Sequence, residues 1–167
     1  MEMITVATIA LVCIWIIVTI GFSILSYCEL RKQKNSTMSI KESMDLVNLP
    51  VVTFENNGNK YNFIIDTGAN DSIINESCEN ILVTPHKSKN IVQGIIGDNK
   101  KCHTVTIEFS YKNMTFETMF NVVDLKALFD AIKEDYGVTI HGILGTNFLD
   151  KYNYIIDFKD YVIYRKK

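Results

Sequence analysis

The first part of the chain is apolar and uncharged, and it limits what the whole protein can be. No charged residue lies between Glu2 and Glu29, and the segment ITVATIALVCIWIIVTIGFSIL between them is almost wholly hydrophobic. An α-helix rises about 1.5 Å per residue, so this segment can cross the roughly 30 Å hydrocarbon core of a bilayer with length left for tilt. We therefore expect residues 1–28 to form a transmembrane anchor.

The residues around the end of this segment predict its orientation. Arg31, Lys32 and Lys34 form the first basic cluster, and the positive-inside rule places such a cluster and the chain after it in the cytoplasm. The alternative is a cleaved signal peptide, which has a basic beginning, a shorter apolar run and a small-residue cleavage site, and the sequence shows none of these clearly. A lipoprotein-type site ending at Cys28 is disfavoured because Tyr27 stands where that signal has a small residue. We expect a single-pass membrane protein with a cytoplasmic soluble domain.

The composition limits the number of domains and the kinds of ligand that the protein can have. A chain of 167 residues has room for one ordinary domain besides the anchor, and a formal net charge of −2 gives no basic field for binding nucleic acid. The four cysteines are scattered and form no C-x-x-C pair, so neither a disulfide scaffold nor a zinc site is expected. Cys78 and Cys102 could pair in an oxidising compartment, but free thiols are favoured. We expect no metal, no cofactor and no nucleic-acid partner.

The part after the anchor is predicted to be mainly β. Residues 29–47 are polar and mixed in sign, and we interpret them as a linker with a short helical turn near residues 40–46. Two β-rich runs flank the turn residues 56–59, which predicts a first hairpin. Alternation in TVTIEFSY followed by Lys112-Asn113 predicts a second hairpin. Strands are expected again in the C-terminal segment.

One segment, residues 124–137, has the pattern of a helix. Gly137 is a plausible stop for this helix, since glycine readily adopts the left-handed conformation that ends helices. The apolar residues expected on its buried face are Leu125, Leu128, Phe129 and Ile132.

The stretch YNFIIDTGAND, residues 61–71, places a carboxylate at the end of an apolar run, where an ionised group is expensive to keep. Asp66 is explained if it is placed there to react. Peptide hydrolysis needs a base for the water and an acid for the carbonyl oxygen or leaving nitrogen, and two carboxyl groups about 3 Å apart that share one proton supply both. The sequence holds no second Asp-Thr-Gly or Asp-Ser-Gly. The partner carboxylate is therefore another acid or Asp66 of a second chain, which an isologous dimer brings onto the axis.

Two segments, FIIDTGANDSI and the later HGILGTNFL, resemble the retropepsin-like aspartic proteases, the single-lobed homodimeric relatives of pepsin. The similarity covers roughly residues 48–167. Three elements match in order, namely the apolar strand leading into Asp66-Thr67-Gly68-Ala69, the glycine-rich segment Gly94-Ile95-Ile96-Gly97, and Ile143-Leu144-Gly145.

The resemblance implies a closed single-lobe β-barrel and a role for each matched residue. It implies that Asp66 is the catalytic acid and base, and that Thr67 hydrogen-bonds across the dimer axis. Gly68 would let the backbone approach the carboxylates, since it lacks a Cβ atom, and Ala69 would line the site. Gly94, Ile95, Ile96 and Gly97 would form a flap over the substrate.

The predicted protein is thus a membrane-anchored aspartic endopeptidase that cleaves an extended polypeptide as a homodimer. The expected parts are the anchor (1–28), the linker (29–47) and the protease domain (48–167). Many relatives carry Ser or Thr after the glycine, whose hydroxyl can stabilise an ionised carboxylate. Ala69 lacks that hydroxyl, which predicts a pH optimum of roughly 5–7 rather than 2–4.

Two other functions remain open. A catalytically idle module of the same fold could bind extended peptides by strand addition, and a structural domain of a membrane complex could use Asp66 only to cap a turn. Ser72 and Ser77 lack a G-x-S-x-G setting, and Cys102-His103 has no third catalytic partner. The isolated histidines fit surface or loop positions better than a metal site: His86, His103 and His141.

Overall fold

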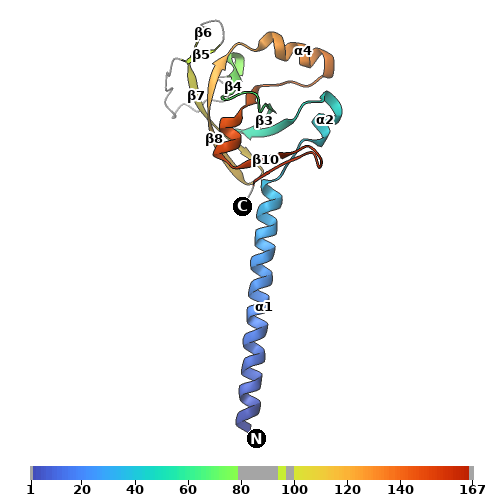
Figure 1. The fold of residues 1–167 in the computed structure, drawn as a ribbon, viewed down its shortest axis with the longest axis vertical. Helices are drawn as coiled ribbons and strands as arrows, with labels where there is room; N and C mark the ends of the chain where they lie inside the picture. The colour runs from blue at the N-terminus through green and yellow to red at the C-terminus, as the bar shows by residue number, and fades with distance from the viewer. Residues whose placement is uncertain (1, 79–93, 97–99, 166–167) are drawn as a thin grey trace. The chain divides into compact units, whose positions relative to one another are not determined.

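The computed structural model describes residues 2–78, 94–96 and 100–165, which belong to two compact units divided between Ser36 and Thr37. The first unit is a single helix, α1 (Glu2–Ser36), drawn in blue in Figure 1. Its segment Val12–Arg31 has a mean hydropathy of 1.9 and is long enough to cross a membrane. Helices of this length and composition occur both as membrane anchors and as signal sequences.

The second unit is built on a closed β-barrel with the strand order β2-β3-β9-β4-β8-β7. The mainly β architecture and the closed barrel expected from the sequence are confirmed. Closure pairs each strand with a neighbour on both sides, so the barrel presents no full-length edge for aggregation. Its strands are β2 (Val51–Asn56), β3 (Asn59–Ile65), β4 (Ser72–Asn75), β7 (Thr104–Tyr111), β8 (Met114–Val123) and β9 (Gly142–Leu144).

Both predicted hairpins are present. In the β2–β3 hairpin Asn56 pairs with Asn59, and the two turn residues Asn57 and Gly58 have φ values of 50° and 78°. Positive φ at both central positions is the type I′ geometry, whose twist matches that of the flanking strands. The β7–β8 hairpin turns at Lys112, where φ is 53°.

Two smaller sheets complete the strands. One is antiparallel with the order β1-β11-β10, formed by β1 (Met38–Ser39), β11 (Val162–Arg165) and β10 (Tyr154–Asp157). The other pairs β5 (Gly94–Ile96) with β6 (Lys100–Cys102). Met38 is completely buried, and the short helix expected near residues 40–46 is present as α2 (Lys41–Val47). Residues 37–47 therefore contribute structure to the second unit.

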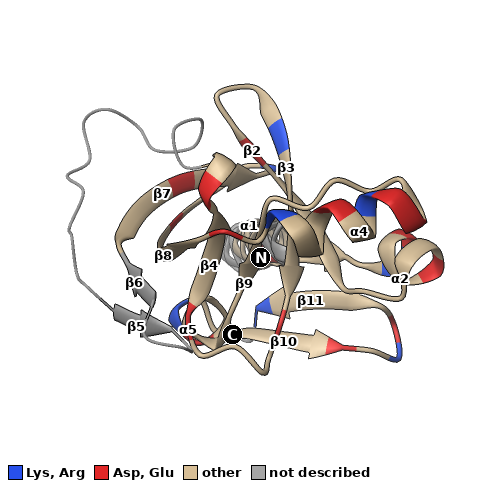
Figure 2. Cartoon of the chain, turned by 90° about the horizontal axis from the view of Figure 1, so that it is seen from above, with Lys and Arg blue, Asp and Glu red and all other residues tan. Residues whose placement is uncertain are grey.

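Helix α4 (Lys126–Tyr136) confirms the predicted helix and ends at Gly137, whose φ is 72°. It lies beside α2, where Figures 1 and 2 both place it, and the two helices share a small apolar cluster that includes Val47 and Phe129. Figure 2 also shows acidic and basic residues on both helices. The expected burial of Leu128 was wrong: its side chain is 52% exposed, because the helix docks through Leu125, Phe129 and Ile132 instead.

Helix α5 (Thr146–Lys151) was not expected, since we predicted strands throughout the C-terminal segment. Six residues span less than two helical turns, which is too short for a helical hydrophobic period to stand out. Phe148 of α5 belongs to the main core, where Phe54 of β2 meets it at a ring-centroid distance of 6.0 Å. Phe54 makes further edge-on contacts at 4.6–6.0 Å with Phe63, Phe109, Tyr111 and Phe116. This aromatic core fixes α5 against the barrel.

Candidate active site

Asp66 lies directly after β3, where this strand runs parallel to β9. Its backbone N–H donates to the carbonyl of Leu144 at 3.0 Å, one residue beyond the paired Ile65 and Leu144. Its side-chain Oδ1 accepts a hydrogen bond from Gly68 N–H at 2.8 Å, and its carbonyl accepts one from Ala69 N–H at 3.3 Å. The carboxylate is therefore held at the start of a tight turn, partly exposed to solvent.

The residues after Asp66 turn outward. Thr67 and Gly68 are exposed and Ala69 is partly buried, and within the described part of the chain the Thr67 hydroxyl makes no hydrogen bond. A Cβ atom at Gly68 would stand 3.2 Å from Asp66 Oδ1, tighter than most such contacts. Glycine here leaves the Asp66 carboxylate room beside the backbone, and the role of Gly68 in a reaction stays a prediction.

The loop after Asp66 rests on the first turn of α5. Thr146 N–H donates to the carbonyl of Ala69 at 2.8 Å, and Asn147 N–H donates to that of Asn70 at 3.1 Å. The Thr146 hydroxyl lies 3.3 Å from both carbonyl oxygens. The first N–H groups of a helix have no partner inside the helix, so α5 satisfies its own donors by binding the Asp66 loop.

A buried polar network connects β4 to the first turn of α5. The Ser72 hydroxyl, which is fully buried, donates to Asn147 Oδ1 at 2.7 Å and accepts from Gly145 N–H at 3.1 Å. Asn147 Oδ1 also accepts from Phe148 N–H at 2.8 Å. Sequence reasoning missed Ser72 and Asn147, which are 75 residues apart. The available signal was the hydroxyl of Ser72 directly before the apolar residues Ile73 and Ile74 of β4.

The late glycine element meets the Asp66 loop. β9 lies between β3, to which it is parallel, and β4, to which it is antiparallel. A Cβ atom at Gly145 would stand 2.7 Å from the carbonyl oxygens of both Ala69 and Asp71, and one at Gly142 would stand 2.6 Å from that of Ile73. Glycine is required at positions 142 and 145 because the backbone of the β9 segment crosses that of residues 69–73 in direct contact. This crossing brings together FIIDTGANDSI and HGILGTNFL, the two segments on which the resemblance to aspartic proteases rests.

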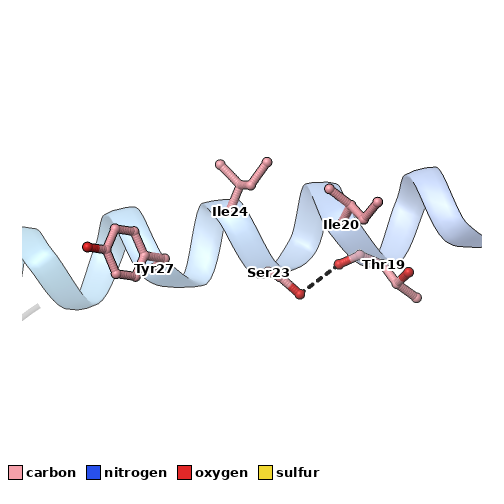
Figure 3. A pocket seen from close by; sticks show the side chains of 5 residues that line it. All are labelled: Thr19, Ile20, Ser23, Ile24 and Tyr27. Atoms are coloured by element: carbon pink, nitrogen blue, oxygen red, sulfur yellow. Dashed lines mark hydrogen bonds between the residues drawn. The ribbon is translucent and has the colours of Figure 1, made fainter.

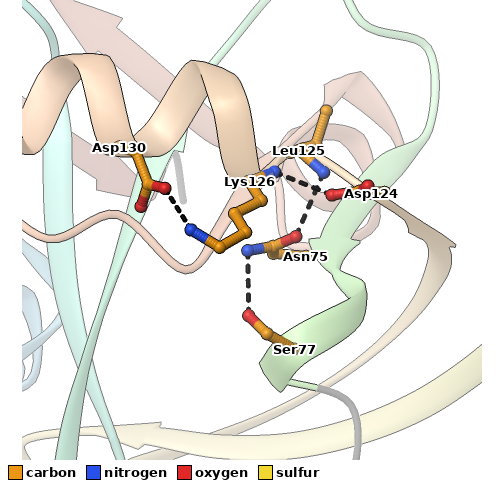
Figure 4. A network of polar contacts seen from close by, with 6 residues as sticks. All are labelled: Asn75, Ser77, Asp124, Leu125, Lys126 and Asp130. Carbon is orange, nitrogen blue, oxygen red and sulfur yellow. Dashed lines mark hydrogen bonds and ion pairs between the residues drawn. The ribbon is translucent and has the colours of Figure 1, made fainter.

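The far end of β4 is fixed by a second network, shown in Figure 4. Asn75 Oδ1 accepts from Leu125 N–H at 3.1 Å, and Asn75 Nδ2 donates to Ser77 Oγ at 3.0 Å. Asp124 Oδ1 accepts from Lys126 N–H at 3.0 Å at the beginning of α4. These contacts join the strand that follows the Asp66 loop to the helix that precedes β9.

The predicted flap falls partly within the described residues. Gly94, Ile95 and Ile96 form β5, which pairs with β6 in the register Gly94–Cys102 to Ile96–Lys100. Gly97 lies outside the described residues. The segment thus has the two-stranded antiparallel form that a flap requires, and its role stays a prediction. Elsewhere, Cys78 is a free thiol whose pKa is raised by burial. Among the described residues, no three His, Cys, Asp or Glu side chains cluster as they would around a metal ion.

Comparison with known families identifies the fold and the class of chemistry. The family model described as aspartyl protease matches residues 52–148, more than half of the chain, and includes Asp66 and Gly145. The chain belongs to the aspartyl protease family. No curated protein matches its sequence.

Solved structures similar to this aspartyl protease include a retropepsin-like aspartic protease from Rickettsia conorii, at 17% identity and a TM-score of 0.49 over 77% of this chain and 87% of that one. The retroviral protease-like domain of Ddi1 from Leishmania major matches at 17% identity and 0.48, over 66% and 82% of the two chains. The EIAV protease in complex with the inhibitor HBY-793 matches at 19% identity and a TM-score of 0.41, over 62% of this chain and 86% of that one. The match to the aspartyl protease family model confirms the aspartic-type peptidase class expected from the sequence.

Proposed function

We propose that this aspartyl protease is a membrane-anchored endopeptidase that is active as a homodimer, with Asp66 of each chain forming the catalytic pair. The observation that carries the proposal is the Asp66 loop itself. It follows the barrel strand β3 and is bound by the first turn of α5, and it carries the partly exposed Asp66 carboxylate beside the exposed Thr67. A single such loop supplies half of the acid–base pair that peptide hydrolysis needs.

In the proposed dimer the two Asp66 carboxyl groups share one proton. The ionised carboxylate takes a proton from a water molecule, whose oxygen attacks the peptide carbonyl carbon, while the protonated carboxyl gives its proton to the carbonyl oxygen. The carboxyl that took the proton from water then passes it to the amide nitrogen, the other carboxylate takes a proton back from a hydroxyl of the tetrahedral intermediate, and the C–N bond breaks to give the acid and the amine. Gly68 and Ala69 would border the scissile bond, and residues 94–97 would close over the substrate.

Two features support pairing with a second copy. The exposed Thr67 hydroxyl has no partner in the described part of its own chain, so it is free to hydrogen-bond across a two-fold axis. In the β1-β11-β10 sheet, β11 has a neighbour on each side whereas β10 has one open edge among the described strands. Confinement of two chains to one membrane would raise their effective concentration and favour the dimer further.

The composition of α1 supports an anchor. Its large apolar side chains, such as Trp15 and Phe22, are exposed within their own unit, which is unfavourable in water and favourable in lipid. Two hydroxyl groups within its apolar segment bond to the helix backbone and so need no water: Thr19 Oγ1 donates to the carbonyl of Ile16 and Ser23 Oγ to that of Thr19, both at 2.9 Å, as Figure 3 shows for the second pair. We infer that this helix spans the membrane once, with the protease domain in the cytoplasm.

The test uses the full chain in lipid nanodiscs beside its Asp66→Asn variant, each incubated with a denatured protein across a pH range from acid to neutral. We expect the wild-type chain alone to produce cut peptides. Peptide products at equal rates from both proteins would contradict the assignment of Asp66. The absence of products from both, with both folded and paired, would favour the peptide-binding module.

Dimerisation is tested in detergent micelles, where chains can exchange. Activity per chain should fall on dilution, and an excess of the Asp66→Asn chain should poison the wild-type chain by forming mixed pairs with one carboxylate. Thr67→Val removes only the hydroxyl at nearly constant shape, and it should shift the loss of activity to higher protein concentration. Activity that is independent of concentration and insensitive to the inactive chain would refute the dimer.

A further inference from the structure

The proposed reaction uses no histidine, yet His141 lies between β3 and β4, close to the strand that leads into Asp66. It directly precedes β9, and its backbone extends the β9 pairing by one residue on both sides. Its N–H donates to the carbonyl of Asn62 on β3 at 2.9 Å, and its carbonyl accepts from Asn75 N–H on β4 at 3.0 Å. The sequence analysis placed this histidine at a surface or loop position, and the structure shows a half-buried residue between two strands.

The imidazole makes a further bond to the same strand. Its Nδ1 accepts a hydrogen bond from Asn62 N–H at 2.9 Å, so both backbone groups of Asn62 are bound by His141. An Nδ1 that accepts a hydrogen bond carries no proton, which selects the neutral tautomer with its proton on Nε2. A proton added at Nδ1 would face the Asn62 N–H, and the bond would have to break.

The hydrogen bond between Asn62 N–H and His141 Nδ1 lies at the beginning of the β3–β9 pairing that leads to Asp66. From the Asn62–His141 contact the two strands run in register through Phe63–Gly142 to Ile65–Leu144, and the next contact is Asp66 N–H to the Leu144 carbonyl. The side-chain bond therefore braces one end of the short parallel ladder that carries the carboxylate at its other end. Loosening this end frees β3 to move relative to β9.

The surroundings of the ring keep it neutral. Tyr61 of β3 presents its ring edge-on to the imidazole at a centroid distance of 5.1 Å, and the backbone of His141 is bound by Asn62 of β3 and Asn75 of β4, which do not titrate. No ion pair to His141 is found among the described residues. Burial lowers the pKa of His141 below its ordinary value of 6.5, because the charged ring would lose hydration.

We propose that His141 is a positioning residue of the peptidase: its neutral imidazole holds β3 against β9, and protonation in acid releases this contact and loosens the Asp66 loop. The proposal rests on the proposed function in that it assigns the reaction to Asp66. Under this proposal, the lowest pH at which the enzyme is active is set by His141, which takes no part in the reaction itself. Activity is then confined to the pH range in which the ring is neutral.

The direction of the pH dependence follows from the lowered pKa. Between 6.5 and the lower pKa of the folded chain, the unfolded chain binds the proton and the folded chain does not. Stability is therefore complete above that range and falls as the pH decreases through it. Each pH unit within the range multiplies the unfolding equilibrium constant by up to about ten for a single proton.

Two substitutions separate the hydrogen bond from the titration. In His141→Asn, the amide Oδ1 stands the same number of bonds from the backbone as Nδ1, so it can accept from Asn62 N–H but cannot be protonated in this pH range. In His141→Leu the acceptor is lost at similar bulk. The full chain in nanodiscs is used for each protein, with urea titration and kcat/KM measured from acid to neutral pH.

We expect wild-type kcat/KM and stability to fall together in acid, the Asn variant to lose this acid decline, and the Leu variant to be impaired at every pH. Selective ¹⁵N-histidine labelling, with the His141 signal assigned by its absence from the Asn variant, should show the Nε2–H tautomer. An Asn variant that keeps the full wild-type acid decline, or a His141 ring protonated on Nδ1 at neutral pH, would overturn the proposal. If the wild-type chain cuts no substrate, the Asp66 proposal fails separately, and the stability and tautomer measurements still decide the role of His141.

Discussion

Replacement of Gly145 by alanine gives the sharpest test of how the active-site loop is supported. The backbone at Gly145 has φ of −86° and ψ of −174°, a conformation open to any residue, so the substitution introduces no backbone strain of its own. Its effect comes from the added Cβ atom, which would stand 2.7 Å from the carbonyl oxygens of Ala69 and Asp71. Ordinary contact begins at 3.4 Å, so each oxygen has to withdraw by about 0.7 Å.

The size of the effect follows from this displacement. Overpacking of a tight interior contact costs about 1–3 kcal/mol of stability. The atoms that must move belong to the loop carrying Asp66, and a misplacement approaching 1 Å costs up to about a hundredfold in catalysis. We therefore expect Gly145→Ala to lower kcat/KM by about ten- to a hundredfold in protein that is still folded, measured at an enzyme concentration high enough to keep the proposed dimer intact.

The matched control is Gly58→Ala in the β2–β3 turn. Gly58 has a φ of 78° and nothing within 4 Å of an added Cβ, so alanine there costs only conformational strain, about 1–2 kcal/mol. This variant should lose comparable stability and keep its activity per folded chain. Unchanged kcat/KM in folded Gly145→Ala, or an equal loss of activity in Gly58→Ala, would refute the reasoning.

Three further predictions concern stability, each measured by urea titration followed by near-ultraviolet circular dichroism. Ser72→Ala leaves Gly145 N–H without its acceptor and should cost about 1–3 kcal/mol; a smaller loss would mean that water replaces the hydroxyl. Phe54→Ala removes a fully buried ring from the aromatic core and should cost about 3–5 kcal/mol, whereas a loss below 1 kcal/mol would show that the core collapses around the gap. The exposed ion pair with Asp130 raises the pKa of Lys126. Asp130→Asn removes this pair and should leave the urea midpoint unchanged, because exposed ion pairs contribute little to stability.

The sequence predicted the parts of the fold that are specified locally. The I′ turn at Asn57-Gly58 is chemically encoded in two residues, and the alternation of the β7 segment indicated a strand with one wet face. Helix α4 was visible because eleven residues cover three turns and a glycine follows. The resemblance brought Asp66 and Gly145 into one hypothesis, and the structure places the Gly145 backbone against Ala69 and Asp71 of the loop that follows Asp66.

The parts that sequence did not predict depend on contacts between distant residues. Nothing local to Ser72 indicates that its hydroxyl binds Asn147, and nothing local to His141 indicates that its ring accepts from Asn62, 79 residues earlier in the chain. A serine or a histidine has the same local chemistry in a core network as on a surface, and only the fold selects between them. Helix α5 belongs to the same class, because packing of Phe148 in the aromatic core and capture of the Asp66 loop stabilise a segment too short to be a helix alone.

The crossing of β9 and α5 behind the Asp66 loop also governs when a growing chain can become a protease. β9 and α5 support that loop through residues 144–147, more than seventy positions after Asp66, so a nascent chain or fragment that ends before β9 carries the proposed catalytic carboxylate without these contacts. Contacts of such long separation form late, because the intervening chain must first be ordered. If Asp66 is catalytic as proposed, biosynthesis delivers the carboxylate early and its supporting surface late, so incomplete products of translation lack the oriented carboxylate needed to cut their neighbours.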